Sequence, residues 1–200
     1  MSMNILVAGA TGKTGLHLVQ NLIDQGHSPT ALVRESSDTS DLPKGTKVRT
    51  GDLTDLADGV CKGMDVVVFA AGSGGKTGPE MTGKVDRDGA KRLTDLAASA
   101  GVKRFVMLSS VGADQENPSG DLAHYLSAKH EADMHLKSSG LNYAIVRPVA
   151  LTNDARGEHV ILGDKVDKKA KASRRDVADV LATAAITGSY DGMALDMQSV

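Results

Sequence analysis

The stretch MNILVAGATGKTGLHLVQNLIDQG, residues 3–26, joins a short apolar run to an amphipathic segment through closely spaced glycines. Residues 4–8 (NILVA) have the continuous apolar character of strands that are buried in parallel sheets. Residues 12–25 predict a helix, because apolar side chains recur three and four residues apart and Gly26 follows its end. The stretch therefore predicts a strand, a glycine turn and a helix, which open a βαβ unit.

The same alternation continues along the chain. Further strands are predicted at residues 30–34, 47–50, 65–70, 103–109 and 142–147. Helices are predicted at residues 86–100 and 121–138, with a weaker one at 55–62, and loops at residues 35–45 and 72–83. Beyond Pro148 the pattern weakens to a strand at 159–162, a helix at 175–187 and a strand at 193–197.

This alternation predicts a doubly wound α/β fold of three layers, with helices on both faces of a mostly parallel sheet. No repeat or linker divides the 200 residues, so we expect a single domain over residues 1–200. Its last part, about residues 149–200, is expected to form a small substrate-side portion.

Composition excludes several classes of protein. The single cysteine, Cys61, rules out a disulfide framework and a cysteine-rich zinc site. The formal charge of -2 provides no basic field for nucleic acid. No apolar run approaches the roughly 20 residues that span a bilayer, and no basic segment precedes the N-terminal apolar run. We therefore expect a cytoplasmic globular protein with a small-molecule substrate and no nucleic-acid or membrane partner; the sequence leaves its oligomeric state open.

The glycine turn has the spacing GxxGxxG. Glycines let the backbone approach a pyrophosphate, and the helix that follows directs its N-terminal amides at the anion. A plain structural turn is the alternative, but the strand before it and the helix after it favour a dinucleotide site. The residues expected to contact the cofactor here are Gly9, Thr11, Gly12, Lys13, Thr14 and Gly15.

Arg34 ends the second predicted strand, where NAD-binding folds carry an acid that holds the ribose 2′-hydroxyl. An arginine can pair with a 2′-phosphate instead, and Lys13 adds charge, so we expect NADP to be preferred over NAD. Glu35 leaves the opposite choice open, because it could hold the 2′-hydroxyl, and a solvated Arg34 is the structural alternative. After the third strand, Asp52 and Leu53 are candidates for contacting the adenine, although Asp after Gly is more often a turn residue.

Tyr125 and Lys129 lie four residues apart within a predicted helix, so the phenol and the ammonium can converge on one face. A nearby ammonium favours the phenolate and lowers the pKa of a tyrosine from about 10. Such a phenol can exchange a proton with a carbonyl or an alcohol. Ser109 and Ser110 end the preceding strand, which places their hydroxyls at the same carboxyl edge of the sheet.

Together these residues resemble the short-chain dehydrogenase/reductase superfamily. The likeness is greatest to its small atypical NAD(P)-binding members, described as NAD-dependent epimerases/dehydratases or NAD(P)H-binding reductases. The resemblance implies an NAD(P)-binding Rossmann fold. It covers nearly the whole chain, through residues 9–15, Arg34, residues 51–53, residues 70–72, residues 101–106, Ser109-Ser110, Tyr125 with Lys129, Arg147-Pro148 and residues 173–178.

The resemblance also implies roles for these residues. Tyr125 is the acid/base, Lys129 holds the nicotinamide ribose and tunes Tyr125, and Ser110, or less favourably Ser109, binds the substrate oxygen. The sugar-nucleotide enzymes of the extended branch carry a large C-terminal lobe, whereas about fifty residues follow Pro148 here, which disfavours a sugar-nucleotide substrate. The other residues expected beside the cofactor are Ala70, Ala71, Gly72 and Pro148.

Three functions fit these residues. The first is an NADP(H)-dependent oxidoreductase acting on a small carbonyl or alcohol, with Tyr125 moving the proton. The second is an NAD(P)H-dependent flavin or quinone reductase, which would use the same cofactor without Tyr125. The third is a non-catalytic NADP(H)-binding redox sensor that signals through a partner.

Three other motifs carry less weight. Residues 70–77 (AAGSGGKT) fit a loose P-loop pattern, but Gly78-Pro79 opposes the helix that a P-loop needs. His130-Glu131 and His135 have HExxxH spacing, which turns the histidines off one helix face, so we expect them to face solvent. Residues 165–175 hold six basic residues, which we expect to form a solvated edge or loop.

Overall fold

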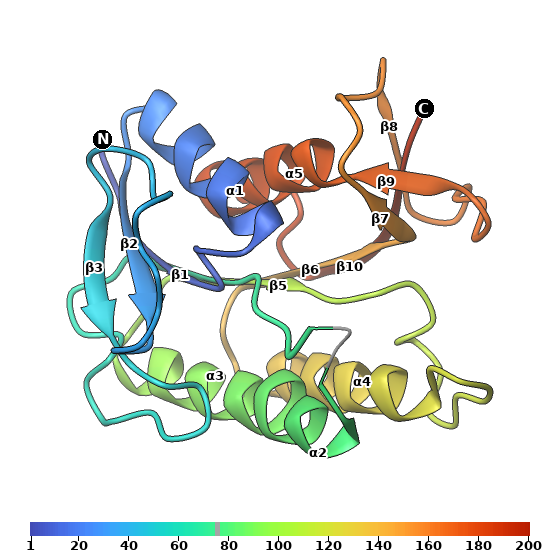
Figure 1. Ribbon diagram of the computed structural model, residues 1–200, viewed down its shortest axis with the longest axis horizontal. Coiled ribbons are helices and arrows are strands. Elements are labelled where there is room, and N and C mark those ends of the chain that lie inside the picture. Colours follow the sequence, from blue (N-terminus) through green and yellow to red (C-terminus); the bar gives the residue numbers. More distant parts are fainter. Residues whose placement is uncertain (75–76) are drawn as a thin grey trace.

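The computed structural model describes residues 1–74 and 77–200, and its centre is an eight-stranded sheet (Figure 1). Neighbouring strands run parallel except the last, β8, which is antiparallel to β10. The predicted doubly wound, mostly parallel α/β fold is therefore confirmed. In spatial order the strands are β3 (Lys47–Thr50), β2 (Ser28–Val33), β1 (Asn4–Ala8), β4 (Val66–Phe69), β5 (Arg104–Leu108), β6 (Tyr143–Pro148), β10 (Met193–Ser199) and β8 (Val160–Leu162).

Helices cover both faces of the sheet (Figure 1). Helices α1 (Lys13–Asp24) and α5 (Arg174–Thr187) pack together on one face. The opposite face carries α2 (Pro79–Thr82), the π-helical segment η1 (Gly83–Gly89), α3 (Ala90–Ser99) and α4 (Ala123–Ser138). A separate two-stranded parallel sheet pairs β7 (Ala150–Thr152) with β9 (Lys171–Ser173).

The alternating side chains of β1 explain why this sheet needs helices on both faces. Ile5 and Val7 belong to the core under α1 and α5, whereas Leu6 and Ala8 belong to the core under α3 and α4. All four are fully buried, and burying an aliphatic side chain stabilises a fold by about 1.5–3 kcal/mol. A strand that is apolar on both faces can reach this burial only between two helical layers.

Chain order changes direction between β1 and β4. From β1 the chain moves outward through β2 and β3, then crosses back to β4 on the other side of β1. Ligands of open α/β sheets bind beyond the carboxyl ends of the strands at such a point, because the loops diverge there and leave a crevice. The Gly9–Gly15 turn after β1 and the loop after β4 lie on either side of it.

Two sequence-based expectations are wrong in detail, and one small sheet was not expected. Residues 55–62 form turns rather than a helix, and Gly59 among them has φ of +83°. The loop expected at 72–83 ends earlier, because Pro79 starts a helical run that continues to Ser99. Proline fits there because the first residue of a helix needs no N–H partner. The short strands β7 and β9 were not anticipated.

Among residues 1–74 and 77–200, no helix combines the length and the apolar character needed to cross a bilayer.

Candidate functional site

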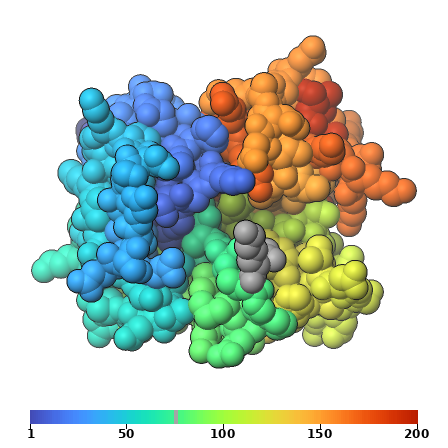
Figure 2. Space-filling model, viewed as in Figure 1, coloured from blue at the N-terminus to red at the C-terminus, as the bar shows by residue number. Residues whose placement is uncertain are grey.

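Two adjoining cavities form one cleft at the carboxyl ends of the strands. We call the one of about 580 Å³ the Tyr125 cavity and the one of about 430 Å³ the Arg34 cavity, after residues that line them. Figure 2 shows the N-terminal, middle and C-terminal segments meeting around the centre of this face. The residues that line both cavities are Gly12, Ala70, Ala71, Gly72, Ser73 and Thr77.

The turn between β1 and α1 borders both cavities, and its Gly12 lines both of them. Gly12 is the N-cap of α1, and its N–H donates to the Gly9 carbonyl at 3.0 Å. No side chain caps this helix end, so the first-turn amides and the positive end of the helix dipole remain available for an anion. The geometry therefore fits a pyrophosphate.

The three glycines of the turn have different structural roles. Gly9 has φ of +84°, and a Cβ there would lie 2.6 Å from the Ala71 nitrogen. A Cβ on Gly15 would overlap the Gly9 carbonyl oxygen. Gly12 has an ordinary φ of -76°, and a Cβ there would meet only the Gly9 oxygen, at 3.2 Å. Gly9 and Gly15 are thus required by the close approach of the backbone. Gly12 is not, but its lack of a side chain leaves space for a ligand above the turn.

The other residues expected at the cradle divide between the two cavities. Thr11 lines the Arg34 cavity, whereas Lys13 and Thr14 line the Tyr125 cavity. Gly15 is buried under the turn and lines neither. The cradle therefore spans the junction of the two cavities.

Arg34 and Asp52 come together at the far end of the Arg34 cavity, next to Leu53. Asp52 Oδ1 accepts hydrogen bonds from the Thr54 N–H at 2.9 Å and the Thr54 hydroxyl at 2.8 Å. These bonds hold the pKa of Asp52 below its usual value, and the positive charge of Arg34 lowers it further. Asp52 is therefore both a turn residue and part of the cavity wall. The exposed Glu35 does not line it.

In the Tyr125 cavity, helix α4 presents Tyr125 and Lys129 on one face. Lys129 is 3% exposed, and its Nζ lies 5.7 Å from the centroid of the Tyr125 ring. The same Nζ lies 3.0 Å from Asp86 Oδ1 and donates to the Leu108 carbonyl at 3.4 Å. Burial lowers the pKa of Lys129, but its interactions with Tyr125 and Asp86 outweigh burial and leave that pKa raised. The 3.0 Å contact with the Asp86 carboxylate favours the ammonium form of Lys129.

Asp86 is the buried counter-ion of Lys129. It is fully buried in η1, and its Oδ2 accepts the Ser73 N–H at 2.9 Å. Asp86 thus connects the loop after β4 to the side chain of Lys129. A buried ammonium without a partner would cost several kcal/mol, so this carboxylate allows a charged lysine to stay beside Tyr125.

A second buried ion pair lies one helical turn further along α4. Arg147 Nε and Nη2 each lie 2.9 Å from Asp133 Oδ2, which also accepts the Ser109 hydroxyl proton at 3.0 Å. Burial raises the pKa of Asp133, whereas Arg147 and Ser109 lower it. Because Ser109 donates its proton to this buried carboxylate, it presents only lone pairs elsewhere.

The two serines after β5 occupy different places. Ser109 lines the Tyr125 cavity, whereas Ser110 does not, and the Ser110 hydroxyl donates to the Val111 carbonyl at 3.3 Å. Pro148 is buried at the end of β6, where its carbonyl accepts the Val111 N–H, and it lines neither cavity. The structure thus brings Ser109, rather than Ser110, to the wall that Tyr125 and Lys129 share.

Several residues of the site were not singled out as functional by the sequence. A usable signal for Asp133 was its four-residue spacing from Lys129, which continues the row begun by Tyr125 on one helix face. Asp86 gave no comparable signal. The others that line the Tyr125 cavity are Ser73, Gly74, Thr77, Thr82, Leu108, Leu122, His124, Leu151 and Arg174.

The weaker motifs have structural roles or lie elsewhere. His130 is half-buried and bonds the Ala113 carbonyl at 2.9 Å, and His135 Nε2 lies 2.6 Å from Asp95. The expectation of a solvent-facing side chain is therefore wrong for His130, whereas His135 pairs with Asp95 at the surface. Residues 165–175 form a loop, β9 and the start of α5, where Arg174 lines the cleft. Lys76 of the P-loop-like stretch lies outside the described residues.

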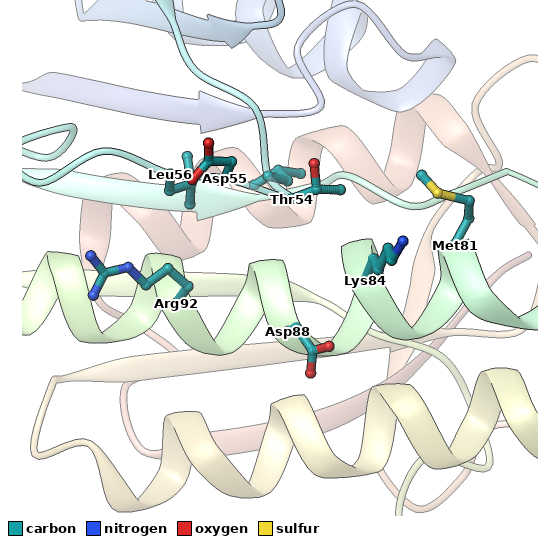
Figure 3. A pocket seen from close by; sticks show the side chains of 8 residues that line it. Thr54, Asp55, Leu56, Met81, Lys84, Asp88 and Arg92 are labelled. Atoms are coloured by element: carbon teal, nitrogen blue, oxygen red, sulfur yellow. The ribbon is translucent and has the colours of Figure 1, made fainter.

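A third cavity, of about 610 Å³, lies between the 53–56 loop and the helical run of η1 and α3 (Figure 3). Figure 3 shows Lys84 and Arg92 on the helix, across from the loop. Lys84 pairs with Glu80 at 2.7 Å and Arg92 with Asp58 at 2.6 Å. The two cations that line this third cavity are thus already neutralised by carboxylates.

Comparison with known proteins is consistent with this geometry. The sugar epimerase YhfK of Bacillus subtilis, itself uncharacterized, is 35% identical over 98% of this chain and 94% of its own. A solved structure from Bacillus halodurans, provisionally named an NAD-dependent epimerase/dehydratase, is 33% identical with a TM-score of 0.93, covering 100% of this chain and 95% of that one. Ceramide reductase of Caulobacter vibrioides is 34% identical over 74% of this chain but 46% of its own.

A protein family described as NAD(P)H-binding matches residues 9–187, which include the glycine cradle, the lining of both cavities and the whole of α5. The matched segment covers most of the chain, and the chain belongs to this NAD(P)H-binding family.

Proposed function

We propose that the protein is an NADP(H)-dependent oxidoreductase of the atypical short-chain dehydrogenase/reductase type, acting on a small carbonyl or alcohol. The observation that carries the proposal is the position of Tyr125 and Lys129 on the wall of a cavity continuous with the glycine cradle. The reductase and epimerase names of the relatives agree with redox chemistry at this site.

The chain's own residues suit an extended dinucleotide. The first-turn amides of α1 would hold the pyrophosphate, and Arg34 would pair with a 2′-phosphate. Asp52 and Leu53 would border the adenine, which places the nicotinamide end in the Tyr125 cavity. When bound, the cofactor supplies a hydride at the nicotinamide C4.

Tyr125 is the group that moves the proton in this proposal. During reduction its phenol donates to the substrate oxygen, and the Lys129 ammonium stabilises the phenolate that results. Ser109 cannot donate while its proton is held by Asp133, so it would contact the substrate as an acceptor. We therefore assign the proton transfer to Tyr125 rather than to Ser109.

The test is reduction of a panel of carbonyl compounds and quinones by the Tyr125→Phe variant. General acid catalysis contributes about 10²–10⁴-fold, so carbonyl reduction should fall by that factor. Lys129→Met should also reduce it, and the double variant should be little worse than the poorer single one, because both disable one unit. Tyr143→Phe is the matched control, since Tyr143 begins β6 at the opposite edge of the sheet.

Two results would replace this proposal. Full activity of Tyr125→Phe on the best substrate would favour a flavin or quinone reductase, in which hydride passes directly to the acceptor. Binding of NADPH without turnover of any compound, together with a captured partner, would favour a redox sensor.

A further inference from the structure

The charges that line the Tyr125 cavity do not balance. Among the described residues that line this cavity, Asp86 is the one that carries a carboxylate. Its 3.0 Å contact with Lys129 neutralises both groups. This leaves Lys13 and Arg174 without a carboxylate partner within the described lining. The third cavity differs in this respect, because its cations are paired. An unbalanced pair of cations in a concave site attracts an anion.

The small sheet β7–β9 places Arg174 over the cavity. Thr152 pairs with Ser173 in its register, so Asn153 and Arg174 emerge side by side. Arg174 Nη1 donates to Asn153 Oδ1 at 2.9 Å, which orients the guanidinium without neutralising it. The side chain is half-buried. This arrangement leaves other N–H groups of the guanidinium for a ligand, and such a fork suits carboxylate and phosphate oxygens.

Arg174 occupies a helix end that its own charge does not stabilise, although Asp176 in the same first turn carries the opposite charge. Arg174 is the first residue of α5, where the positive end of the helix dipole disfavours a cation. The adjacent Arg175 is exposed and lies near His17 of α1, whose pKa is lowered first by burial and then by the charge of Arg175. The two arginines thus share a helix end, but only Arg174 lines the cavity.

Apolar side chains form another part of the wall. Leu108, Leu122 and Leu151 line the cavity. Leu122 is 60% exposed and Leu151 is 36% exposed, so an apolar surface at the mouth is left uncovered. The volume of about 580 Å³ is typical of small-molecule sites, and the nicotinamide end must share it. A substrate here is therefore small and partly apolar.

The geometry points to an anion subsite: Arg174 binds the carboxylate or phosphate group of a small, partly apolar carbonyl substrate whose oxygen faces Tyr125. This inference rests on the proposed function and specifies its substrate class. Arg174 acts here as a specificity-determining residue. The competing role for its charge is contact with the cofactor's own phosphates, since Lys13 of the cradle lines the same cavity.

The experiment measures binding to the NADP⁺-loaded protein by calorimetry at fixed salt. The probes are phenylacetate, phenyl phosphate and the neutral phenylacetamide. Both anions should bind at least tenfold more tightly than the amide, because a charge-assisted hydrogen bond is worth about ten- to a hundredfold in affinity. Arg174→Gln should remove this difference, Arg174→Lys should restore part of it, and Arg175→Gln should leave it unchanged. The tighter anion identifies the substrate group.

A kinetic comparison gives an independent readout. Arg174→Gln should raise KM at least tenfold for phenylglyoxylate and leave KM for its methyl ester unchanged, with kcat little affected in both. Equal binding of amide and anions would overturn the subsite. So would equal losses in Arg174→Gln and Arg175→Gln, or a loss of NADP⁺ affinity alone in Arg174→Gln. If no carbonyl is reduced but anion binding depends on Arg174, the oxidoreductase proposal fails and the subsite stands.

Discussion

The Arg34 cavity and the Tyr125 cavity adjoin each other but are built from different parts of the chain. The glycine cradle beside the Arg34 cavity depends on main-chain geometry at Gly9 and Gly15, with exposed or half-buried polar side chains around the cavity. The Tyr125 cavity depends on charged side chains that are buried in pairs, Asp86 with Lys129 and Asp133 with Arg147. One end of the cleft therefore requires a constrained backbone, and the other end requires charged side chains to be buried.

The difference shows what each end is suited for. A backbone cradle binds a phosphate through amides that need no particular side chain. A buried ion pair costs desolvation and is weak evidence for stability, so its presence beside Tyr125 is better explained by the need for a fixed ammonium there. The comparison predicts that breaking a buried ion pair beside Tyr125 causes the largest loss of folding energy, whereas replacing Arg34 changes ligand choice.

The largest effect is expected from Asp86→Ala, which leaves the Lys129 ammonium without its partner. Breaking a buried pair costs about 3–5 kcal/mol, so urea denaturation should show a loss of that size in the free energy of unfolding. Asp88→Ala is the matched control on η1, because Asp88 is exposed and pairs with Arg87 at the surface, where such pairs contribute about 0–1 kcal/mol. Similar losses in both variants would contradict the assigned role of Asp86.

At the other end, Arg34→Ala should change cofactor choice and not stability. A charge-assisted bond to a 2′-phosphate contributes about 1.5–3 kcal/mol, or about ten- to a hundredfold in affinity. Fluorescence titration should show that the variant binds NADPH more weakly by that factor, while its affinity for NADH is unchanged. Glu35→Gln separates the alternative: a weakened NADH complex in Glu35→Gln, with an unchanged ratio in Arg34→Ala, would assign the 2′-hydroxyl to Glu35.

The two ends also differed in how far the sequence predicted them. The cradle was predictable because a buried strand, spaced glycines and an amphipathic helix are local signals, as at residues 4–25. Asp86 was not, because a charged residue in a helix is ordinarily exposed and its partner Lys129 is distant in sequence. The strands β7 and β9 have three residues each, too few to show a period of two.

Two smaller differences have equally physical causes. The start of the α2 helical run was placed too late because Gly78-Pro79 indicates a break, yet proline is favourable as the first residue of a helix. The resemblance favoured Ser110 over Ser109 as the substrate contact. In the structure Ser109 lines the cavity, whereas the Ser110 hydroxyl donates to the Val111 carbonyl.

Gly15→Ala tests whether the cradle depends on backbone packing. The new Cβ would overlap the Gly9 carbonyl oxygen and lie 2.8 Å from the Ala10 Cα. Overpacking of this kind costs about 1–3 kcal/mol, which thermal unfolding should show as a lowered Tm. Gly78→Ala is the control, since its φ is -76° and its Cβ would meet nothing within 4 Å.

Gly12→Val, by contrast, should fold normally and bind NADPH poorly, because Gly12 has an ordinary φ and lines both cavities. NADPH affinity equal to that of the wild type would remove Gly12 from the cofactor site.

The smallest effect is expected from Asp52→Asn, and it should depend on pH. Hydrogen bonds from Thr54, and then the charge of Arg34, hold the pKa of Asp52 below its ordinary value of 3.8. A carboxyl group with a lowered folded-state pKa contributes its stability above the unfolded pKa and loses it as pH falls through the folded pKa.

The variant should therefore be less stable than the wild type by about 0.5 kcal/mol at pH 7, the lower end for a half-exposed hydrogen bond. The difference should persist at pH 5 and shrink towards zero as the pH falls below the lowered pKa, because the wild-type carboxyl is then protonated as well. Urea denaturation at several pH values measures this, with Asp55→Asn as the control on an exposed neighbour. A difference that grew on acidification would mean that Asp52 is protonated more readily in the folded state, and that its bonds to Thr54 do not hold the charge at this end of the cleft.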